Sequence, residues 1–156
     1  MVIRGINKIR GFELVKGAPT DAKLPLRGSE YSAGYDFYAP CDIIIPAYGF
    51  SKLTPLNVKA YMLNDEYLKL VVRSSLATTK ARLQVSQGTA IIDADYYNNP
   101  TNEGNIGVMF YNRSNKRVVI KKGERCCQGI FCKYLEADNC NVKKARKGGY
   151  GSTGKK

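Results

Sequence analysis

The sequence contains no histidine, and this absence narrows the chemistry open to the protein more than any other feature of its composition. Histidine is the usual general base near neutral pH, the usual activator of a nucleophile and the commonest metal ligand. Any catalysis must therefore rest on carboxylates, hydroxyls, Lys or Arg, or on a hard metal bound by carboxylates. Magnesium fits that description because it prefers oxygen ligands.

Long apolar runs are also absent. No stretch approaches the length of a membrane-spanning helix, and the N-terminal sequence MVIRGINKIRGFELV has charges where a signal peptide is apolar. The five cysteines are an odd number without C-x-x-C spacing, which makes a zinc site improbable. Cys126 and Cys127 are expected on opposite faces of a strand, so at most one could join a common site. We predict a cytoplasmic protein with no membrane segment, whose cysteines are small core residues.

The chain of 156 residues is long enough for one domain with a real core. Its formal net charge is +12, and six Lys or Arg with no acidic residue lie from Asn141 to Lys156. Such an excess suggests an anionic partner. Binding to nucleic acid or to a regulatory protein is therefore an alternative function, although no recognisable nucleic-acid module accompanies the charge.

Short apolar segments separated by turn residues dominate the chain, among them CDIII, YLKLVV, GTAIID and GIFCKYL. Strand-length pieces rich in Val, Ile, Tyr and Phe at this spacing predict an all-β barrel or sandwich. One short helix is expected, capped by Ser74 or Ser75 and continuing to about Lys80. We predict a β domain over residues 1–140, followed by a linker-like tail over 141–156.

Candidate carboxylates lie in DADYYNNPTNEGN, a segment expected to form a hairpin with an extended loop. Asp93 and Asp95 would share one face of a strand, where two carboxylates repel unless a cation or a proton lies between them. One of them could orient a water molecule as a base, and Tyr96 could stack on a sugar or a nucleobase. The alternative is a pair of turn acids that cap local N–H groups.

Other segments offer phosphate contacts. Arg73 lies beside two serines at the expected helix start, where free N–H groups favour phosphate, although a plain N-cap explains the pattern equally well. Gln128, on a strand, needs hydrogen-bond partners from the protein or a ligand. The C-terminal RKGGYGSTGKK nearly matches a P-loop, but no helix follows it. It is either a glycine-rich segment that wraps a polyphosphate once ordered or a frayed, solubilising tail.

Five segments are informative through their order along the chain rather than individually: AGYDFYA, RSSLA, GTAIIDADYY, GERCCQ and GGYGSTG. In this order they closely resemble the five motifs of the trimeric deoxyuridine triphosphate nucleotidohydrolases (dUTPases). The resemblance extends over about residues 30 to 154, and the third and fifth segments are its most specific parts.

The resemblance implies an all-β, dUTPase-like β-barrel or jelly-roll with one short helix and a flexible C-terminal arm over 141–156. It implies hydrolysis of dUTP to dUMP and pyrophosphate by water attack at the α-phosphorus, with Mg²⁺ as cofactor. That reaction limits uracil incorporation into DNA and supplies dUMP for dTMP synthesis. The resemblance also implies a homotrimer with shared active sites, in which the arm of one subunit closes a site built by the others.

Carried onto this sequence, the family motifs make Asp93 the general base that holds the water, with Asp36 supporting the metal indirectly through water. Tyr96 would pack under the deoxyribose, Gln87 and nearby backbone would read uracil, and Tyr150 would close over the base. The remaining expected substrate contacts are Arg73, Ser74, Ser75, Gln128, Arg146, Ser152 and Thr153.

Three features depart from the family pattern. Arg146 lies one place closer to Gly148 than usual, the segment YNNPTNEG lengthens the loop after the third motif, and Tyr150 replaces the usual Phe. The dCTP deaminases share the expected fold and the RSSLA segment. They use a glutamate as proton shuttle where this sequence has Met109, which cannot transfer a proton.

Overall fold

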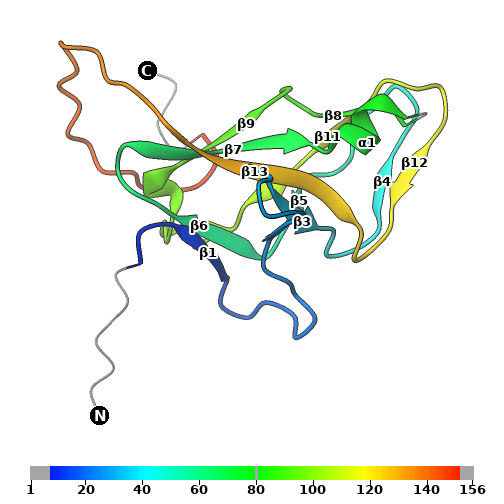
Figure 1. The fold of residues 1–156 in the computed structure, drawn as a ribbon, viewed down its shortest axis with the longest axis horizontal. Coiled ribbons are helices and arrows are strands. Elements are labelled where there is room, and N and C mark those ends of the chain that lie inside the picture. Colours follow the sequence, from blue (N-terminus) through cyan, green and yellow to red (C-terminus); the bar gives the residue numbers. More distant parts are fainter. Residues whose placement is uncertain (1–7, 80, 152–156) are drawn as a thin grey trace.

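The computed structural model describes residues 8–79 and 81–151, and nearly all of the regular secondary structure in this part is β-strand, joined by turns and loops (Figure 1). The strands are β1 (Gly11–Leu14), β2 (Leu26–Arg27), β3 (Tyr35–Tyr38), β4 (Ile43–Ile45), β5 (Thr54–Pro55), β6 (Val58–Tyr61), β7 (Glu66–Val72), β8 (Leu83–Val85), β9 (Ala90–Asp93), β10 (Gly107–Val108), β11 (Phe110–Asn112), β12 (Val118–Ile120) and β13 (Arg125–Lys133). The helices are α1 (Ser74–Thr78) and the short 3₁₀ turn η1 (Ala94–Tyr96). The expected all-β fold with one short α-helix is confirmed.

The long strand β13 forms the centre of a five-stranded antiparallel sheet with the order β2-β3-β13-β7-β9 (Figure 1). The other strands form two-stranded pairs: β1 with β6, β5 with β10, β8 with β11 and β4 with β12. In β7, Glu66, Leu68 and Leu70 are buried while the residues between them are partly exposed, which is the period-2 pattern of a half-buried strand. The sheet therefore sets which side chains of neighbouring strands share a face.

The hydrophobic core lies against this sheet and is filled by side chains from residues 37 to 127. Its largest fully buried apolar members are Phe37, Ile45, Val58, Leu68, Leu70, Leu83, Val85, Ile106, Val108, Phe110 and Ile120. Position 129 on β13 is occupied by glycine, and a Cβ there would lie 2.9 Å from the Phe37 ring and 3.1 Å from Leu68. Close packing at that point fixes β13 against β3 and β7.

The short helix begins differently from the expectation. Its N-cap is Arg73, in extended conformation, and both serines lie inside the helix, so the predicted serine cap is wrong. No side chain caps the first turn, and α1 ends at Thr78 rather than near Lys80. Arg73 leaves β7 in extended geometry, and its side chain donates a hydrogen bond to Asp36 on β3.

The segment after β9 is not the expected hairpin. β9 pairs with β7, whereas β10 pairs with β5, so the two strands belong to different sheets. Between them the chain makes the η1 turn and then a compact loop with positive φ at Asn98, Glu103 and Gly104. Turn-forming residues are equally compatible with a hairpin and with a loop between sheets, so they do not distinguish the predicted hairpin from the loop that is observed.

All five cysteines are free thiols. Cys126 and Cys127 are fully buried core residues as predicted, but the prediction is wrong for Cys41 and Cys140, which are exposed, and Cys132 is only partly buried. Cys126 and Cys127 do not lie on opposite faces as expected, because their sulfur atoms are 3.9 Å apart. The register of β13 against β3 shifts between Arg125 and Cys127, and such a bulge interrupts the alternation of side chains. No helix in the described part of the chain has the length and apolar character to cross a bilayer.

A buried carboxylate ties the N-terminal segment to the sheet. Glu66, at the start of β7, is 3% exposed and accepts hydrogen bonds from Arg10 Nε at 3.1 Å and Arg10 Nη2 at 2.6 Å. The Arg10 guanidinium, helped by the backbone N–H of Leu63, holds the pKa of the Glu66 carboxyl below its ordinary value of 4.5 against the opposing effect of burial. The ionised form is therefore the one that stabilises the fold.

Glu66→Gln tests this pair through the pH dependence of stability. Because the folded pKa is lowered, the contribution of Glu66 is fully present above the unfolded value of about 4.5 and is lost as pH falls through the lower folded value. Urea unfolding should show a wild-type advantage over Glu66→Gln that is constant near neutral pH and shrinks in acid. An advantage that is unchanged in acid, or shared by the exposed control Glu30→Gln, would contradict this assignment.

Candidate functional site

The predicted site residues, joined by Arg125, form two groups on and beside the five-stranded sheet. The first, which we call the arginine cluster, consists of Asp36, Arg73, Ser74, Arg125 and Gln128. These residues line a small hollow of about 230 Å³ together with Gly28, Ser29, Ser32 and Gly34. Asp36 Oδ1 accepts a hydrogen bond from Arg73 Nε at 2.9 Å, and Asp36 Oδ2 accepts one from Arg125 Nη1 at 3.3 Å. The nearly buried carboxylate therefore orients two cations at the mouth of one hollow.

Gln128 belongs to the same hollow because the pairing of β13 with β3 places it opposite Asp36. Gly34, just before β3, leaves room for it. A Cβ at Gly34 would overlap the Gln128 side-chain amide, with Gln128 Cδ only 2.9 Å away. The arrangement presents an amide, a hydroxyl and two guanidinium groups, a donor set suited to an anion with several oxygens.

The second group, which we call the aspartate cluster, consists of Asp93, Asp95, Tyr96, Arg146 and Tyr150. Asp93 ends β9, and Asp95 lies in η1, so only Asp93 is on a strand as predicted. Arg146 Nη1 is 3.1 Å from Asp93 Oδ2 and 3.2 Å from Asp95 Oδ1. The cation that two neighbouring carboxylates require is thus supplied by the C-terminal segment.

Arg146 is held on several sides. Its side chain is only 13% exposed, whereas the two carboxylates are more than half exposed. Its guanidinium carbon lies 5.2 Å from the centre of the Tyr96 ring, close enough for a cation–π contact, and its Nε donates to Gly148 O at 2.9 Å. The turn that Arg146 closes is what places the paired glycines, Gly148 and Gly149, against the body of the protein.

Tyr150 lies beside Tyr96, with ring centres 6.1 Å apart. Its ring is largely exposed, but its hydroxyl lies against Gly107, where a Cβ would collide with it. Burial of this end, reinforced by the neighbouring Tyr96 hydroxyl, raises the pKa of Tyr150. The phenol is therefore neutral at physiological pH and presents an aromatic face next to Tyr96.

The two clusters are far apart on one chain. Asp36 pairs through Gln128 with Val71, and Asp93 pairs with Tyr67, four residues along β7. Three inter-strand spacings and four residues of strand separate Asp36 from Asp93 by roughly 20 Å. A single nucleotide phosphate cannot contact both clusters of one chain.

The remaining predicted residues are placed as follows. Ser75 is exposed in α1, beside Ser74 but outside the hollow. Gln87 is exposed in the turn between β8 and β9, where its Oε1 accepts a hydrogen bond from Ser86 Oγ at 2.8 Å. Ser152 and Thr153 lie outside the described residues.

Sequence reasoning assigned no role to Arg125, Thr101 or Asn102. Arg125 could have been predicted from the sequence, because it belongs to the same short segment as Gln128 and is a cation near a predicted phosphate contact. No motif in the sequence marks Thr101. Its hydroxyl matters because it accepts a hydrogen bond from Gly149 N–H at 2.7 Å. Contacts between distant loops leave no local signal.

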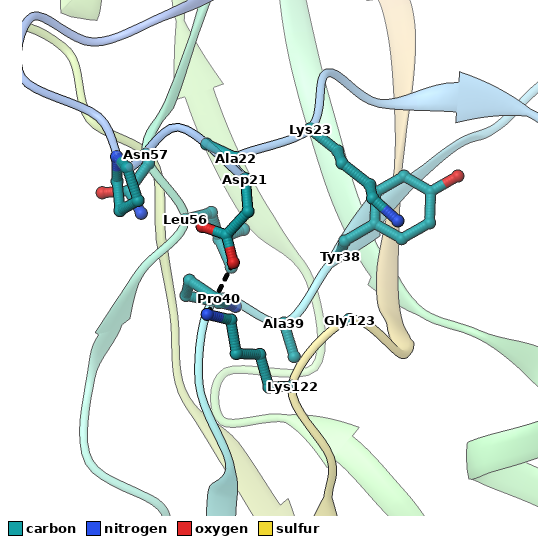
Figure 2. A pocket seen from close by; sticks show the side chains of 11 residues that line it. Asp21, Ala22, Lys23, Tyr38, Ala39, Pro40, Leu56, Asn57, Lys122 and Gly123 are labelled. Carbon is teal, nitrogen blue, oxygen red and sulfur yellow. Dashed lines mark ion pairs between the residues drawn. The ribbon is translucent and has the colours of Figure 1, made fainter.

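Another hollow, of about 360 Å³, lies between the segment around Asp21 and the end of β3 (Figure 2). Its carboxylate, Asp21, is paired with the Lys122 ammonium at 2.6 Å. That ammonium holds the pKa of Asp21 below its ordinary value, which makes this group a fixed counter-ion and a weak base. This hollow therefore lacks a carboxylate free to activate water.

Comparison with known proteins assigns the family. The dUTPase family model matches residues 20–154, most of the chain. The chain belongs to the dUTPase family. It is 43% identical over 150 residues to the deoxyuridine 5'-triphosphate nucleotidohydrolase of Lactococcus lactis subsp. lactis (strain IL1403), covering 94% of this chain and 99% of that protein.

Solved structures agree. The crystal structure of dUTPase from Streptococcus mutans superimposes with a TM-score of 0.75 at 40% identity, covering 83% of this chain and 99% of that one. A mutant dUTPase from phage phi11 of S. aureus, in which coordination of a structural Mg(II) ion is described, has a TM-score of 0.68 at 16% identity over 86% and 97% of the two chains. At that identity the phage protein supports the fold alone. The family assignment rests on the family model and the two bacterial relatives.

Proposed function

We propose that this chain hydrolyses dUTP to dUMP and pyrophosphate, with Asp93 as the general base. The reaction follows from the family to which the chain belongs. The observation that carries the role of Asp93 is its position: a largely exposed carboxylate at the end of β9, paired with Arg146, whose guanidinium group lies over the Tyr96 ring. In a protein without histidine, a positioned carboxylate that is ionised near neutral pH is suited to accept a proton from water.

In the proposed step the water oxygen forms a bond to the α-phosphorus as its proton passes to the Asp93 carboxylate. The bond from that phosphorus to the oxygen bridging to the β-phosphate breaks, and pyrophosphate leaves with the electron pair. Arg146 would have to exchange its contact with Asp93 for a phosphate oxygen, which the triphosphate offers in several copies. That exchange would free Asp93 for water and place positive charge where negative charge develops.

The aspartate cluster also suits the nucleoside. We propose that Tyr96 packs under the deoxyribose and that Tyr150 closes over the base, since the two rings already lie next to each other. Gln87, exposed in its turn, and nearby backbone would read the edge of uracil. Ser152 and Thr153 would add phosphate contacts from the same arm.

We propose that the arginine cluster binds the phosphates through Arg73, Ser74 and Gln128, with Ser75 and Arg125 beside them. Mg²⁺ would supply charge neutralisation on the triphosphate. Among the residues that the structure describes, no group of three or more Cys, Asp or Glu side chains could enclose a metal ion. Both Asp36 oxygens are already engaged by arginines, so Asp36 fits a role through water better than direct coordination. This suits an ion bound chiefly by phosphates and water.

We further propose a homotrimer with shared sites. Because the two clusters of one chain are roughly 20 Å apart, a complete site would combine the aspartate cluster of one copy with the arginine cluster of another. Exposed apolar side chains are available to be buried between copies: Ile91 lies on the edge strand β9, and Ile44, Phe50 and Leu53 surround a hollow of about 640 Å³. In this structure the C-terminal arm contacts Asp93 and Thr101 of its own chain. In the proposed trimer the arm of a neighbouring copy would make these contacts instead, because all copies present the same residues.

In a cell, the reaction would lower the dUTP available for incorporation into DNA and supply dUMP for dTMP synthesis. We place it in the cytoplasm on the evidence of the free thiols.

Asp93→Asn, with Asp95→Asn as its matched control, tests the general base. Both carboxylates accept a hydrogen bond from Arg146, so the two variants lose a comparable contact and differ in the proposed chemistry. Pyrophosphate release from dUTP with Mg²⁺ should fall by about 10²- to 10⁴-fold in Asp93→Asn and little in Asp95→Asn. Wild-type protein should release little pyrophosphate from dCTP, dTTP or UTP. Equal losses in the two variants would remove Asp93 from this role.

Gly34→Ala, with Gly28→Ala as its control, tests the arginine cluster. A Cβ at Gly34 displaces the Gln128 amide, whereas one at Gly28 meets Asp36 Oδ2 at an ordinary 3.6 Å. Loss of one hydrogen bond to a charged phosphate should raise KM for dUTP by about tenfold or more in Gly34→Ala. Gly28→Ala should leave it nearly unchanged, and similar KM values for the two variants would show that Gln128 does not contact the substrate.

A further inference from the structure

The loop of residues 98–105, here called the 98–105 loop, includes most of the segment that lengthens the chain after the third motif, one of the three departures from the family pattern noted above. It is internally braced. The buried Asn99 side chain donates from Nδ2 to Tyr96 O at 2.8 Å, and its Oδ1 accepts from Thr101 Oγ1 at 2.9 Å and from Asn102 N at 3.2 Å. A side-chain amide that satisfies several groups of one turn fixes the shape of that turn.

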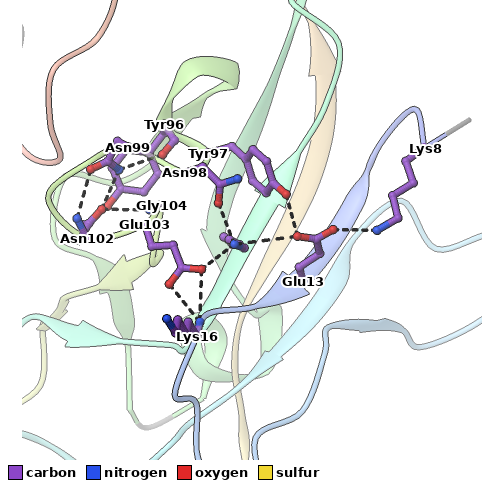
Figure 3. Close-up of polar contacts among 11 residues, drawn as sticks. Lys8, Glu13, Lys16, Tyr96, Tyr97, Asn98, Asn99, Asn102, Glu103 and Gly104 are labelled. Atoms are coloured by element: carbon purple, nitrogen blue, oxygen red, sulfur yellow. Dashed lines mark hydrogen bonds and ion pairs between the residues drawn. The ribbon is translucent and has the colours of Figure 1, made fainter.

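A buried cation fixes the base of the 98–105 loop to the body of the protein. Lys59 on β6, whose side chain is 9% exposed, donates to Asn98 Oδ1 and to Glu103 Oε1, each at 2.7 Å. Glu103 also accepts from the backbone N–H of Lys16 at 3.0 Å (Figure 3). Both ends of the loop are therefore attached to strands or to the segment that follows β1, which leaves the tip between them well defined.

The tip of the loop meets the C-terminal arm at one point. Gly149 N–H donates to Thr101 Oγ1 at 2.7 Å. Because the proton of that hydroxyl is directed to Asn99 Oδ1, the oxygen is left with lone pairs for the arm. Gly149 is buried, and a Cβ there would lie 3.0 Å from Asn102 Nδ2, so glycine allows this close approach without a shift of the Asn102 amide.

The same loop connects the arm to the aspartate cluster. Asn102 Nδ2 donates to the Tyr96 hydroxyl at 2.7 Å, and that hydroxyl donates to Asn105 O at 3.0 Å. The ring that we propose to pack under the deoxyribose is therefore held by the residue that also abuts Gly149. Arm position and Tyr96 position are set by one rigid element.

We propose that the 98–105 loop is a docking platform for the C-terminal arm, with Thr101 and Asn102 as positioning residues for the proposed dUTP hydrolysis; the inference rests on that function. A docked arm already has Arg146 and Tyr150 near the nucleotide site before substrate arrives. Less conformational entropy is then lost when the arm closes over substrate, and the apparent affinity rises with the fraction of docked arms.

Hydrogen–deuterium exchange of the full-length protein without nucleotide tests the docking contact directly. Thr101→Val keeps the shape of the side chain but removes the acceptor for Gly149 N–H and the hydroxyl donor to Asn99 Oδ1. Thr101→Ser keeps the hydroxyl, and Thr20→Val makes the same change at an exposed threonine elsewhere. Protection of the peptide that contains Gly149 should fall by about fivefold in Thr101→Val, as expected for one neutral hydrogen bond. Thr101→Ser and Thr20→Val should stay within about twofold of wild type. Unchanged protection in Thr101→Val would overturn the proposal.

Steady-state kinetics with dUTP and Mg²⁺ then test whether docking matters for the reaction. Thr101→Val should raise KM by about fivefold with a smaller change in kcat, and Thr101→Ser should restore the wild-type KM. Weaker protection with wild-type kinetics would reduce the contact to a structural one and overturn the positioning role. Absence of dUTP hydrolysis in the wild type would refute the proposed function, a failure distinct from unchanged exchange because exchange requires no activity.

Discussion

The hydrogen-bond register of the five-stranded sheet is the constraint on which the rest of this structure depends. It places Asp36 opposite Gln128 on β13, and Gln128 opposite Val71 on β7. Asp93 lies opposite Tyr67, which is four residues from Val71 along the same strand. Strand geometry alone then separates the arginine cluster from the aspartate cluster. Neither cluster has the groups for the whole reaction, because one offers donors for phosphate and the other offers the proposed general base and aromatic rings.

Electrostatics at the aspartate cluster suit an arm that must both dock and leave. Arg146 contacts two carboxylates that are mostly in solvent, and ion pairs of that kind contribute little net free energy. A tightly bound arm would exclude the nucleotide, whereas an unattached one would close slowly and at a larger cost in entropy. The neutral contacts with the 98–105 loop hold the arm near the site while the exposed ion pairs remain easy to exchange for phosphate.

Much of the fold could be predicted from the sequence because its signals are local. Short β-branched and aromatic segments between turn residues gave the all-β class, and RSSLA marked the short helix. The errors arose where distant residues decide local structure. Arg73, which reaches across to Asp36, precedes α1 in place of a serine, and the segment after Asp93 leaves its sheet because β10 pairs with β5.

The same distinction applies to the site. The order of the motifs identified the family, and the notion that a cation must lie between Asp93 and Asp95 followed from like-charge repulsion. That Arg146 is this cation depends on the path of an arm that follows β13 by more than ten residues, and no periodicity in the sequence records that path. The role of Thr101 depends in turn on the position of Gly149, which the turn held by Arg146 places within hydrogen-bond distance of the Thr101 hydroxyl.

The most direct measurement is complementation between two inactive variants. Asp93→Asn and Arg73→Ala, each inactive alone, would be unfolded together, refolded as a mixture and assayed for pyrophosphate release from dUTP. If each site takes its aspartate cluster and its arginine cluster from different copies, random 1:1 mixing restores about one quarter of wild-type activity. Activity that stays at the level of the separate variants would contradict the account, because it would mean that one chain supplies both clusters to its own site.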